Sequence, residues 1–180
     1  MRLSRVAPLL TALAVLALNG CGKSPNFVAQ EEPWRDEEER ACLASGVVVA
    51  DNRFLQSRSA LGGPSVCGAL RPFDMHAAAA GRVSMKPAAL LRCPMVPAVE
   101  RWVQYVVEPA AMQHLRVPLA ELKVAASYSC RPRNGISGGK LSEHGHANAL
   151  DVSGFSLADG RTITVKDGWN GSRDEQAFLR

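Results

Sequence analysis

Residues 122–165 read LKVAASYSCRPRNGISGGKLSEHGHANALDVSGFSLADGRTITV, and this stretch decides the fold class. Residues 122–128 are predicted to form a strand, and residues 150–155 alternate enough to form a second one. A turn at residues 158–160 then leads into residues 161–165, which are typical of a partner strand. The glycine-containing segment between the first two strands is expected to be a loop.

The best predicted helix lies upstream, in residues 97–115. Its apolar residues recur three and four positions apart, as a buried stripe requires: Val99, Trp102, Val103, Val106 and Ala110. Pro97 suits the first turn, and Pro109 is expected to kink or end the helix. Ser172 is expected to cap a final helix that starts near Asp174. Helices followed by a strand-rich half predict an α+β domain, with a small, mainly antiparallel sheet flanked by helices.

Composition excludes several classes of protein. The chain has 180 residues, of which 47% are hydrophobic and 21% are charged, so it is not a fully disordered chain. The formal net charge is only +4 and the sequence has no Lys/Arg-rich run, which excludes a typical nucleic-acid binder. Aromatic residues make up 6%, too few for a surface that stacks bases or sugars.

Residues 1–20 are predicted to be a lipoprotein signal peptide. Two arginines precede the apolar residues 6–18, a stretch too short to span a membrane. Leu18-Asn19-Gly20-Cys21 then resembles a bacterial lipobox, in which the Cys21 thiol is acylated and becomes the new N-terminus. The alternative is an ordinary secretory peptide that is cut near Gly20. Either interpretation predicts export, and lipidation predicts a membrane anchor in the cell envelope. Gly22 favours the periplasmic side of the outer membrane.

The exported chain has an even number of further cysteines: Cys42, Cys67, Cys93 and Cys130. Their spacing matches no zinc motif, so we expect disulfides, with three connectivities left open. Residues 31–40 carry six acidic side chains. We therefore interpret residues 21–40 as a solvated acidic tether and residues 41–180 as the folded domain.

Three polar residues that are able to carry chemistry fall within ten positions: Ser142, His144 and Asp151. Asp151 lies in a predicted strand, where alternation turns it away from its two apolar neighbours. A carboxylate in such a strand is costly unless it is paired or bound to a cation. The candidate partners are Arg131, Arg133, Lys140 or a metal ion.

Zinc is one account of this cluster, because an imidazole nitrogen and a carboxylate oxygen suit Zn²⁺. The spacing is equally compatible with a loop histidine and an aspartate that accepts backbone hydrogen bonds. His146 is an additional candidate ligand, since it lies two residues from His144 on the same loop. His76 and His114 are more typical of surface or helix-end histidines.

Residues 127–155 resemble the extensin-like C-terminal domain family of bacterial envelope proteins. The matching motifs also include Cys67-Gly68, Leu90-Leu91-Arg92-Cys93-Pro94, Trp102 and Trp169, and together they cover residues 41–180. The order Arg131, Ser142, His144, Asp151 is also similar to that of the D-Ala-D-Ala carboxypeptidases among the LAS zinc peptidases. One departure is Ala147, where many relatives have glycine, a change that costs little if its φ is negative.

The resemblance implies a LAS-like fold and a zinc-dependent peptidoglycan peptidase. His144 and Asp151 would be metal ligands, Arg131 would bind the terminal carboxylate of a stem peptide, and Ser142 would steady the ligand loop. These families place a His-x-His motif with the third ligand near the C-terminus, and here no histidine follows His146. We therefore expect a chain truncated before that motif. The alternative is a non-catalytic envelope lipoprotein that binds peptidoglycan or has a structural role.

Overall fold

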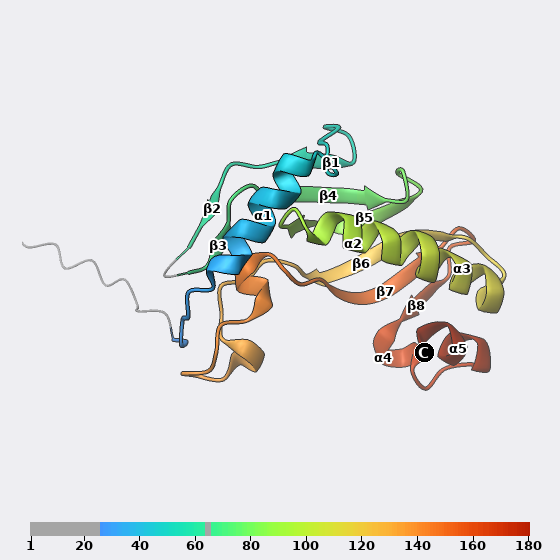
Figure 1. Ribbon diagram of the computed structural model, residues 1–180. Coiled ribbons are helices and arrows are strands. Elements are labelled where there is room, and N and C mark those ends of the chain that lie inside the picture. Colours follow the sequence, from blue (N-terminus) through green and yellow to red (C-terminus); the bar gives the residue numbers. More distant parts are fainter. Residues whose placement is uncertain (1–25, 64–65) are drawn as a thin grey trace, which may run out of the picture.

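The computed structural model describes residues 26–63 and 66–180, so the lipobox and Cys21 lie outside the described residues. A six-stranded sheet forms the centre of the domain, in the order β1-β4-β5-β6-β7-β8 (Figure 1). Its strands are β1 Leu55–Ser57, β4 Phe73–Ala78, β5 Val83–Leu91, β6 Leu119–Ala126, β7 Asp151–Leu157 and β8 Thr162–Thr164. A separate hairpin joins β2 Leu61–Gly62 to β3 Gly68–Ala69.

Within the six-stranded sheet, β5 and β6 run parallel and all other neighbours are antiparallel. Parallel neighbours need a crossover connection, and here the crossover is the long helix between them. The predicted mainly antiparallel α+β fold is confirmed. The hairpin expected from the turn at residues 158–160 is confirmed as well, since β7 pairs with β8.

The crossover helix runs without a break from Met95 to Leu115. It consists of α2 Met95–Trp102, the π-helical segment η1 Val103–Val107, α3 Glu108–Ala110 and the π-helical segment η2 Ala111–Leu115. Pro109 was expected to kink or end this helix, and the helix does not end there. The amide of Glu108 donates to the carbonyl of Val103, five residues earlier, and this wider turn accommodates the proline ring.

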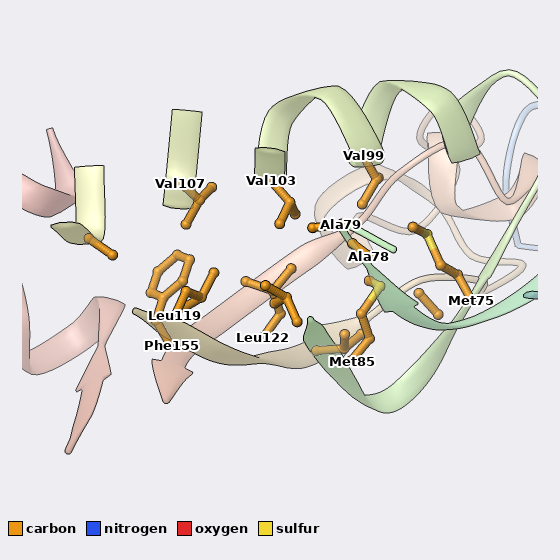
Figure 2. Packing of buried hydrophobic residues seen from close by; sticks show 14 of the residues in the cluster. Met75, Ala78, Ala79, Met85, Val99, Val103, Val107, Leu119, Leu122 and Phe155 are labelled. Carbon is orange, nitrogen blue, oxygen red and sulfur yellow. The ribbon is translucent and has the colours of Figure 1, made fainter. Parts of the chain in front are cut away.

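The π turns also change which side chains of the crossover helix are buried. The buried stripe is Val99, Val103, Val107, Ala111 and Leu115, with a spacing of four residues. Val106, which the sequence placed on the buried face, is instead exposed. Figure 2 shows Val99, Val103 and Val107 above the sheet residues Leu119, Leu122 and Phe155, so the helix and one face of the sheet enclose the core.

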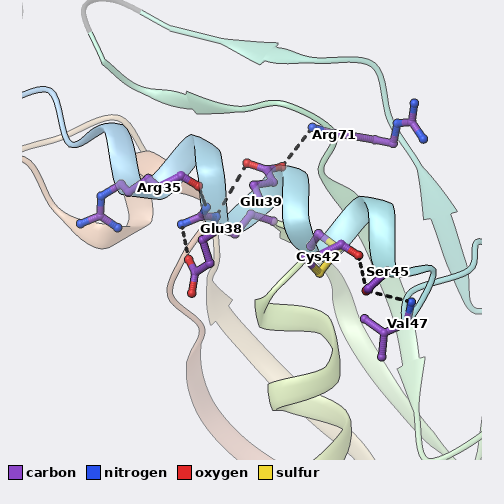
Figure 3. The surroundings of a disulfide bond; sticks show 9 residues. Arg35, Glu38, Glu39, Cys42, Ser45, Val47 and Arg71 are labelled. Atoms are coloured by element: carbon purple, nitrogen blue, oxygen red, sulfur yellow. Dashed lines mark hydrogen bonds and ion pairs between the residues drawn. A yellow bond between two sulfur atoms is a disulfide. The ribbon is translucent and has the colours of Figure 1, made fainter.

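The expected acidic tether is in part a packed helix. α1 begins at Pro33 and ends at Ser45, so it takes in most of the charged run. Glu39 is buried, and its carboxylate accepts the backbone amide of Arg71 at 3.0 Å (Figure 3). The tether interpretation is therefore wrong from residue 33 onward, because these charges have specific partners in the domain.

Arg92 holds α1 against the rest of the domain. Its side chain is buried, donates to the carbonyl oxygen of Arg35, and lies 3.3 Å from the carboxylate of Glu38 and 3.7 Å from that of Glu39. A buried guanidinium needs such partners, since an unpaired charge in the interior is strongly destabilising. The charged run is thus part of the folded structure.

Two disulfides, Cys42–Cys93 and Cys67–Cys130, confirm the prediction that these four cysteines form disulfides. The first ties α1 to the start of the crossover helix, and the second ties the β2–β3 hairpin to the segment that follows β6. The C-terminal region consists of α4 Val165–Gly168 and α5 Arg173–Leu179. Ser172 caps α5 in a reciprocal arrangement with Glu175, as predicted.

Candidate functional site

The site is built on the segment between β6 and β7. The amide of Ser142 donates to the carbonyl of Arg131 at 3.0 Å, and the amide of Ser129 donates to the carbonyl of His144 at 3.0 Å. These bonds place residues 129–131, which follow β6, against a short 3₁₀ turn, η4 Glu143–His146. Ser142 begins that turn, and its hydroxyl accepts the amide of His144 at 3.4 Å. Its role in the structure is therefore that of a capping hydroxyl.

His144 and Asp151 are brought together, as a role as ligands of one metal ion would require. His144 is buried, with 7% of its surface exposed, and its Nε2 lies 3.2 Å from Oδ2 of Asp151. The other ring nitrogen, Nδ1, lies 2.6 Å from the carbonyl oxygen of Ser127. Both nitrogens thus face oxygen atoms, whereas a neutral imidazole has a single N–H. The contact between Nε2 and Oδ2 therefore needs a positive charge between the two atoms, which either a second proton on the ring or a metal ion would supply.

Ser127 fixes the orientation of the imidazole, a role that no sequence pattern indicated. Its hydroxyl accepts the amide of Leu90 at 3.0 Å, which ties this end of β6 to β5. Its carbonyl oxygen then receives Nδ1 of His144, which leaves Nε2 directed at Asp151. A backbone carbonyl is available from any residue type, so no sequence pattern could have found this contact.

Asp151 is not a buried core carboxylate. It opens β7, and 54% of its side chain is exposed. Its neighbours Leu150 and Val152 both line an apolar cavity of about 630 Å³ beside the crossover helix, so Asp151 does point away from them. The Asp151 carboxylate is therefore not destabilised by burial, contrary to what its place in a strand suggested. Its partner is His144 rather than Arg131, Arg133 or Lys140.

Arg131 is half-buried beside this turn. Within the described part of the chain its guanidinium forms no ion pair, and its Nη1 donates to the carbonyl oxygen of Pro132 at 3.5 Å. The structure therefore places the Arg131 backbone next to Ser142. Among the described residues, no carboxylate forms an ion pair with the Arg131 guanidinium.

Glu143 connects the turn to α1. Its two carboxylate oxygens accept Nη1 and Nη2 of Arg35 at 2.8 and 2.7 Å, and Nδ2 of Asn148 donates to one of them at 2.8 Å. Burial alone would raise the pKa of Glu143, but the hydrogen bonds from Arg35 and Asn148 outweigh it and hold that pKa below its usual range. Sequence spacing had not linked α1 to this site.

His146 faces a different environment from His144. It lines a cavity of about 550 Å³ between α1 and the β2–β3 hairpin, together with Arg35, Glu39 and Arg92. Burial, followed by the nearby charge of Arg35, lowers the pKa of His146. Among residues 26–63 and 66–180, no three side chains of His, Cys, Asp or Glu gather as metal ligands would.

Ala147 closes the turn with a left-handed backbone. Its φ is 51°, and the residue is fully buried. A negative φ would have made the departure from glycine inexpensive, and this condition is not met. The left-handed conformation costs a non-glycine residue roughly 1–2 kcal/mol, so the packing around the turn must offset that strain.

None of the helices in the described part of the chain is long and apolar enough to cross a membrane. The chain matches no curated protein, and it matches no solved structure either. A family model does match it, under the description "Extensin-like protein C-terminus", over residues 40–180. The match begins within α1 and includes both disulfides, the turn η4 and the His144–Asp151 pair. Since it spans well over half of the sequence, the chain belongs to the extensin-like C-terminal domain family.

Proposed function

We propose that this protein is an exported, lipid-anchored cell-envelope protein that binds zinc through His144 and Asp151, at a site of the zinc-peptidase type directed at peptidoglycan peptides. The observation that carries the proposal is the orientation of His144. Its Nδ1 is held by a backbone carbonyl while Nε2 meets a carboxylate, an arrangement that histidine ligands of zinc commonly have.

The separation of the two candidate ligand atoms supports zinc. Two atoms that each lie about 2.0–2.2 Å from one tetrahedral zinc ion are roughly 3.3–3.6 Å apart. Nε2 of His144 and Oδ2 of Asp151 are 3.2 Å apart, so a small adjustment would suffice. Asp151 is also half-exposed, which leaves the pair accessible to a metal ion and to a substrate.

Other residues of the chain would orient the substrate. Arg131 has an uncommitted, half-buried guanidinium near the turn, and its planar fork suits the terminal carboxylate of a peptide. Ser142 keeps the turn in place through the amide of His144. When bound, zinc would act as a Lewis acid and lower the pKa of a bound water toward ~7.

A second candidate is a peptidoglycan-binding envelope lipoprotein without hydrolytic activity. It is favoured by the count of ligands, since catalytic zinc is usually held by three protein groups and the described residues bring two together. The two candidates share the zinc site and the Arg131 contact, and they differ in whether a peptide bond is broken.

The test is a zinc titration of the full chain by calorimetry, after chelation and dialysis. We expect one zinc ion per chain, and binding at least about tenfold weaker in His144→Ala and in Asp151→Asn. His114→Ala is the matched control, because His114 lies at the end of the crossover helix, and it should bind zinc like the unchanged protein. Zinc binding that survives both His144→Ala and Asp151→Asn would exclude this site.

The two candidates are then separated with a synthetic stem peptide that ends in D-Ala-D-Ala. Arg131→Ala should weaken peptide binding in both cases, with zinc binding unchanged. Release of D-alanine that stops on chelation and returns with zinc supports the peptidase. Zinc-dependent binding of the peptide without release supports the binding protein.

A further inference from the structure

The first described residues of the chain are hydrogen-bonded to the loop that leads into the candidate site. The amide of Val28 donates to the carbonyl of Gly139 at 2.8 Å, and the amide of Leu141 donates to the carbonyl of Val28 at 3.2 Å. The amide of Gly138 donates to the carbonyl of Asn26 at 3.2 Å. Asn26 is therefore held against residues 137–141, directly before the turn that carries His144.

This contact fixes how far the domain can move from a lipid on Cys21. Asn26 follows Cys21 by five residues, and an extended chain spans at most about 3.3–3.6 Å per residue. The Asn26 end of the domain therefore lies within about 18 Å of the acylated cysteine. The crossover helix alone, Met95–Leu115, is about 30 Å long, so a domain held within about 18 Å of the lipid keeps its Asn26 end toward the bilayer.

The end that faces the bilayer carries exposed apolar side chains. Val28 is 59% exposed, Trp34 is 50% exposed and Ile136 is 62% exposed. Val28 and Ile136 are joined through Gly139, whose amide donates to the carbonyl of Ile136 and whose carbonyl accepts the amide of Val28. In Figure 1 the start of α1 and the loop before η4 lie at the same end of the molecule, opposite α4 and α5.

Basic side chains lie beside the apolar ones at this end. Arg133 and Lys140 are exposed on the loop, and the guanidinium of Arg35 lies 4.4 Å from the centre of the Trp34 ring. Arg35 is itself paired with Glu32 and Glu143, so Arg133 and Lys140 supply the positive charge of this surface. Tryptophan beside basic side chains is typical of surfaces that rest at the membrane interface.

We infer that Val28, Trp34 and Ile136, with Arg133 and Lys140, form a membrane-contact surface that rests on the lipid bilayer. The inference depends on the lipid anchor of the proposed function and adds an orientation to it. The loop that carries Ile136 runs directly into the turn that carries His144. The candidate site therefore opens in the layer next to the membrane, where peptides linked to lipid or close to the bilayer would reach it.

Tryptophan fluorescence tests this orientation, because Trp34 and Trp169 are almost equally exposed, at 50% and 49%. Trp34 is in the first turn of α1 and Trp169 directly follows α4, and these two elements lie at opposite ends of the domain in Figure 1. Two variants of the full protein, W102F/W169F and W34F/W102F, each retain one of the two tryptophans. Both are purified from host membranes and reconstituted in phosphatidylcholine vesicles brominated near the top of the acyl chains. We expect the bromine to quench Trp34 at least twofold more than Trp169.

A matched pair of substitutions checks the surface itself. In the variant that retains Trp34, Ile136→Asp should reduce quenching, whereas Val49→Asp, at an exposed position outside the surface, should leave it unchanged. Hydrogen exchange on the unsubstituted protein gives the same answer without any substitution, because residues 133–141 should gain protection on vesicles and residues 158–170 should not.

The outcomes separate the anchor from the orientation. Protein that fails to sediment with vesicles lacks the anchor, and both proposals fall. Protein that sediments but shows equal quenching of the two tryptophans, or stronger quenching of Trp169, is anchored without this contact, and only the orientation is overturned. Zinc binding is independent of either result.

Discussion

Arg35 and Glu143 lie 108 positions apart in the sequence and form a two-pronged ion pair, with N–O distances of 2.8 and 2.7 Å. Arg35 lies in the first turns of α1, and Glu143 directly precedes His144 in the turn of the candidate site. α1, whose residues were predicted to belong to a solvated tether, therefore supports the turn that carries the candidate ligand His144.

Separating this pair should destabilise the domain. The arginine side chain is 11% exposed and the glutamate side chain 37%, so we expect a coupling free energy of about 1 kcal/mol in a double-mutant cycle of Arg35→Ala and Glu143→Gln. Urea unfolding gives the four stabilities. Arg40→Ala breaks a solvent-exposed pair with Asp36 and should change stability little. Additive effects of the two substitutions would show that the pair is not coupled.

The β2–β3 hairpin provides a sharp test of backbone packing, because Gly62 and Gly68 are directly paired in it. A methyl group at Gly68 would lie 1.9 Å from the carbonyl oxygen of Leu61, at a φ of +131°. A methyl group at Gly62 would meet nothing within 4 Å. Gly68→Ala should therefore cost at least about 1–3 kcal/mol by thermal unfolding, and Gly62→Ala should be close to neutral. Equal losses would contradict the hairpin register.

Glu121 should make stability depend on pH in the acid range. The hydrogen bond from Lys86, 3.0 Å away, lowers the pKa of Glu121 below its ordinary value of 4.5. A lowered pKa in the folded state means that the contribution to stability is complete above about pH 4.5 and is lost as the pH falls through the folded pKa. The stability difference between the unchanged protein and Glu121→Gln should therefore shrink between pH 7 and pH 3. Lys86→Gln should give the same pH profile, and a difference that persists at pH 3 would argue against the pair.

Each disulfide should contribute substantially to stability, since the two close loops of 51 and 63 residues. Replacing either pair by serines should cost about 2–5 kcal/mol, chiefly because the unfolded chain gains freedom. Peptide mapping without reduction should recover Cys42 with Cys93 and Cys67 with Cys130. Recovery of Cys42 with Cys67 would contradict the arrangement of α1 on the domain.

Local patterns predicted the parts of the fold that depend on local physics. The β7–β8 hairpin, the crossover helix and the Ser172 cap all follow from spacing and turn chemistry within a few residues. The π turns escaped prediction, because sequence periodicity assumes a uniform helix and Val106 therefore seemed buried. The packing of α1 escaped prediction because its partners, such as Glu143, are distant in the sequence.

For the candidate site, the contact between the two candidate ligands was predicted, whereas their surroundings were not. The resemblance to the zinc peptidases suggested that His144 and Asp151 meet, and the structure places them in contact. The environment of the pair was not predictable, since the orientation of His144 rests on the carbonyl of Ser127 and Asp151 proves to be half-exposed. Whether the pair binds zinc stays a prediction.

The two disulfides are interleaved, because Cys67 lies between Cys42 and Cys93 while its partner Cys130 lies beyond both. A protease that cuts one peptide bond anywhere between Cys42 and Cys130 therefore leaves the chain as one covalent molecule. A nick in the loop near Gly63, or in the crossover helix, would release no fragment until the disulfides were reduced. The protein can thus sustain such damage and still keep α1, the sheet and the His144 turn joined together.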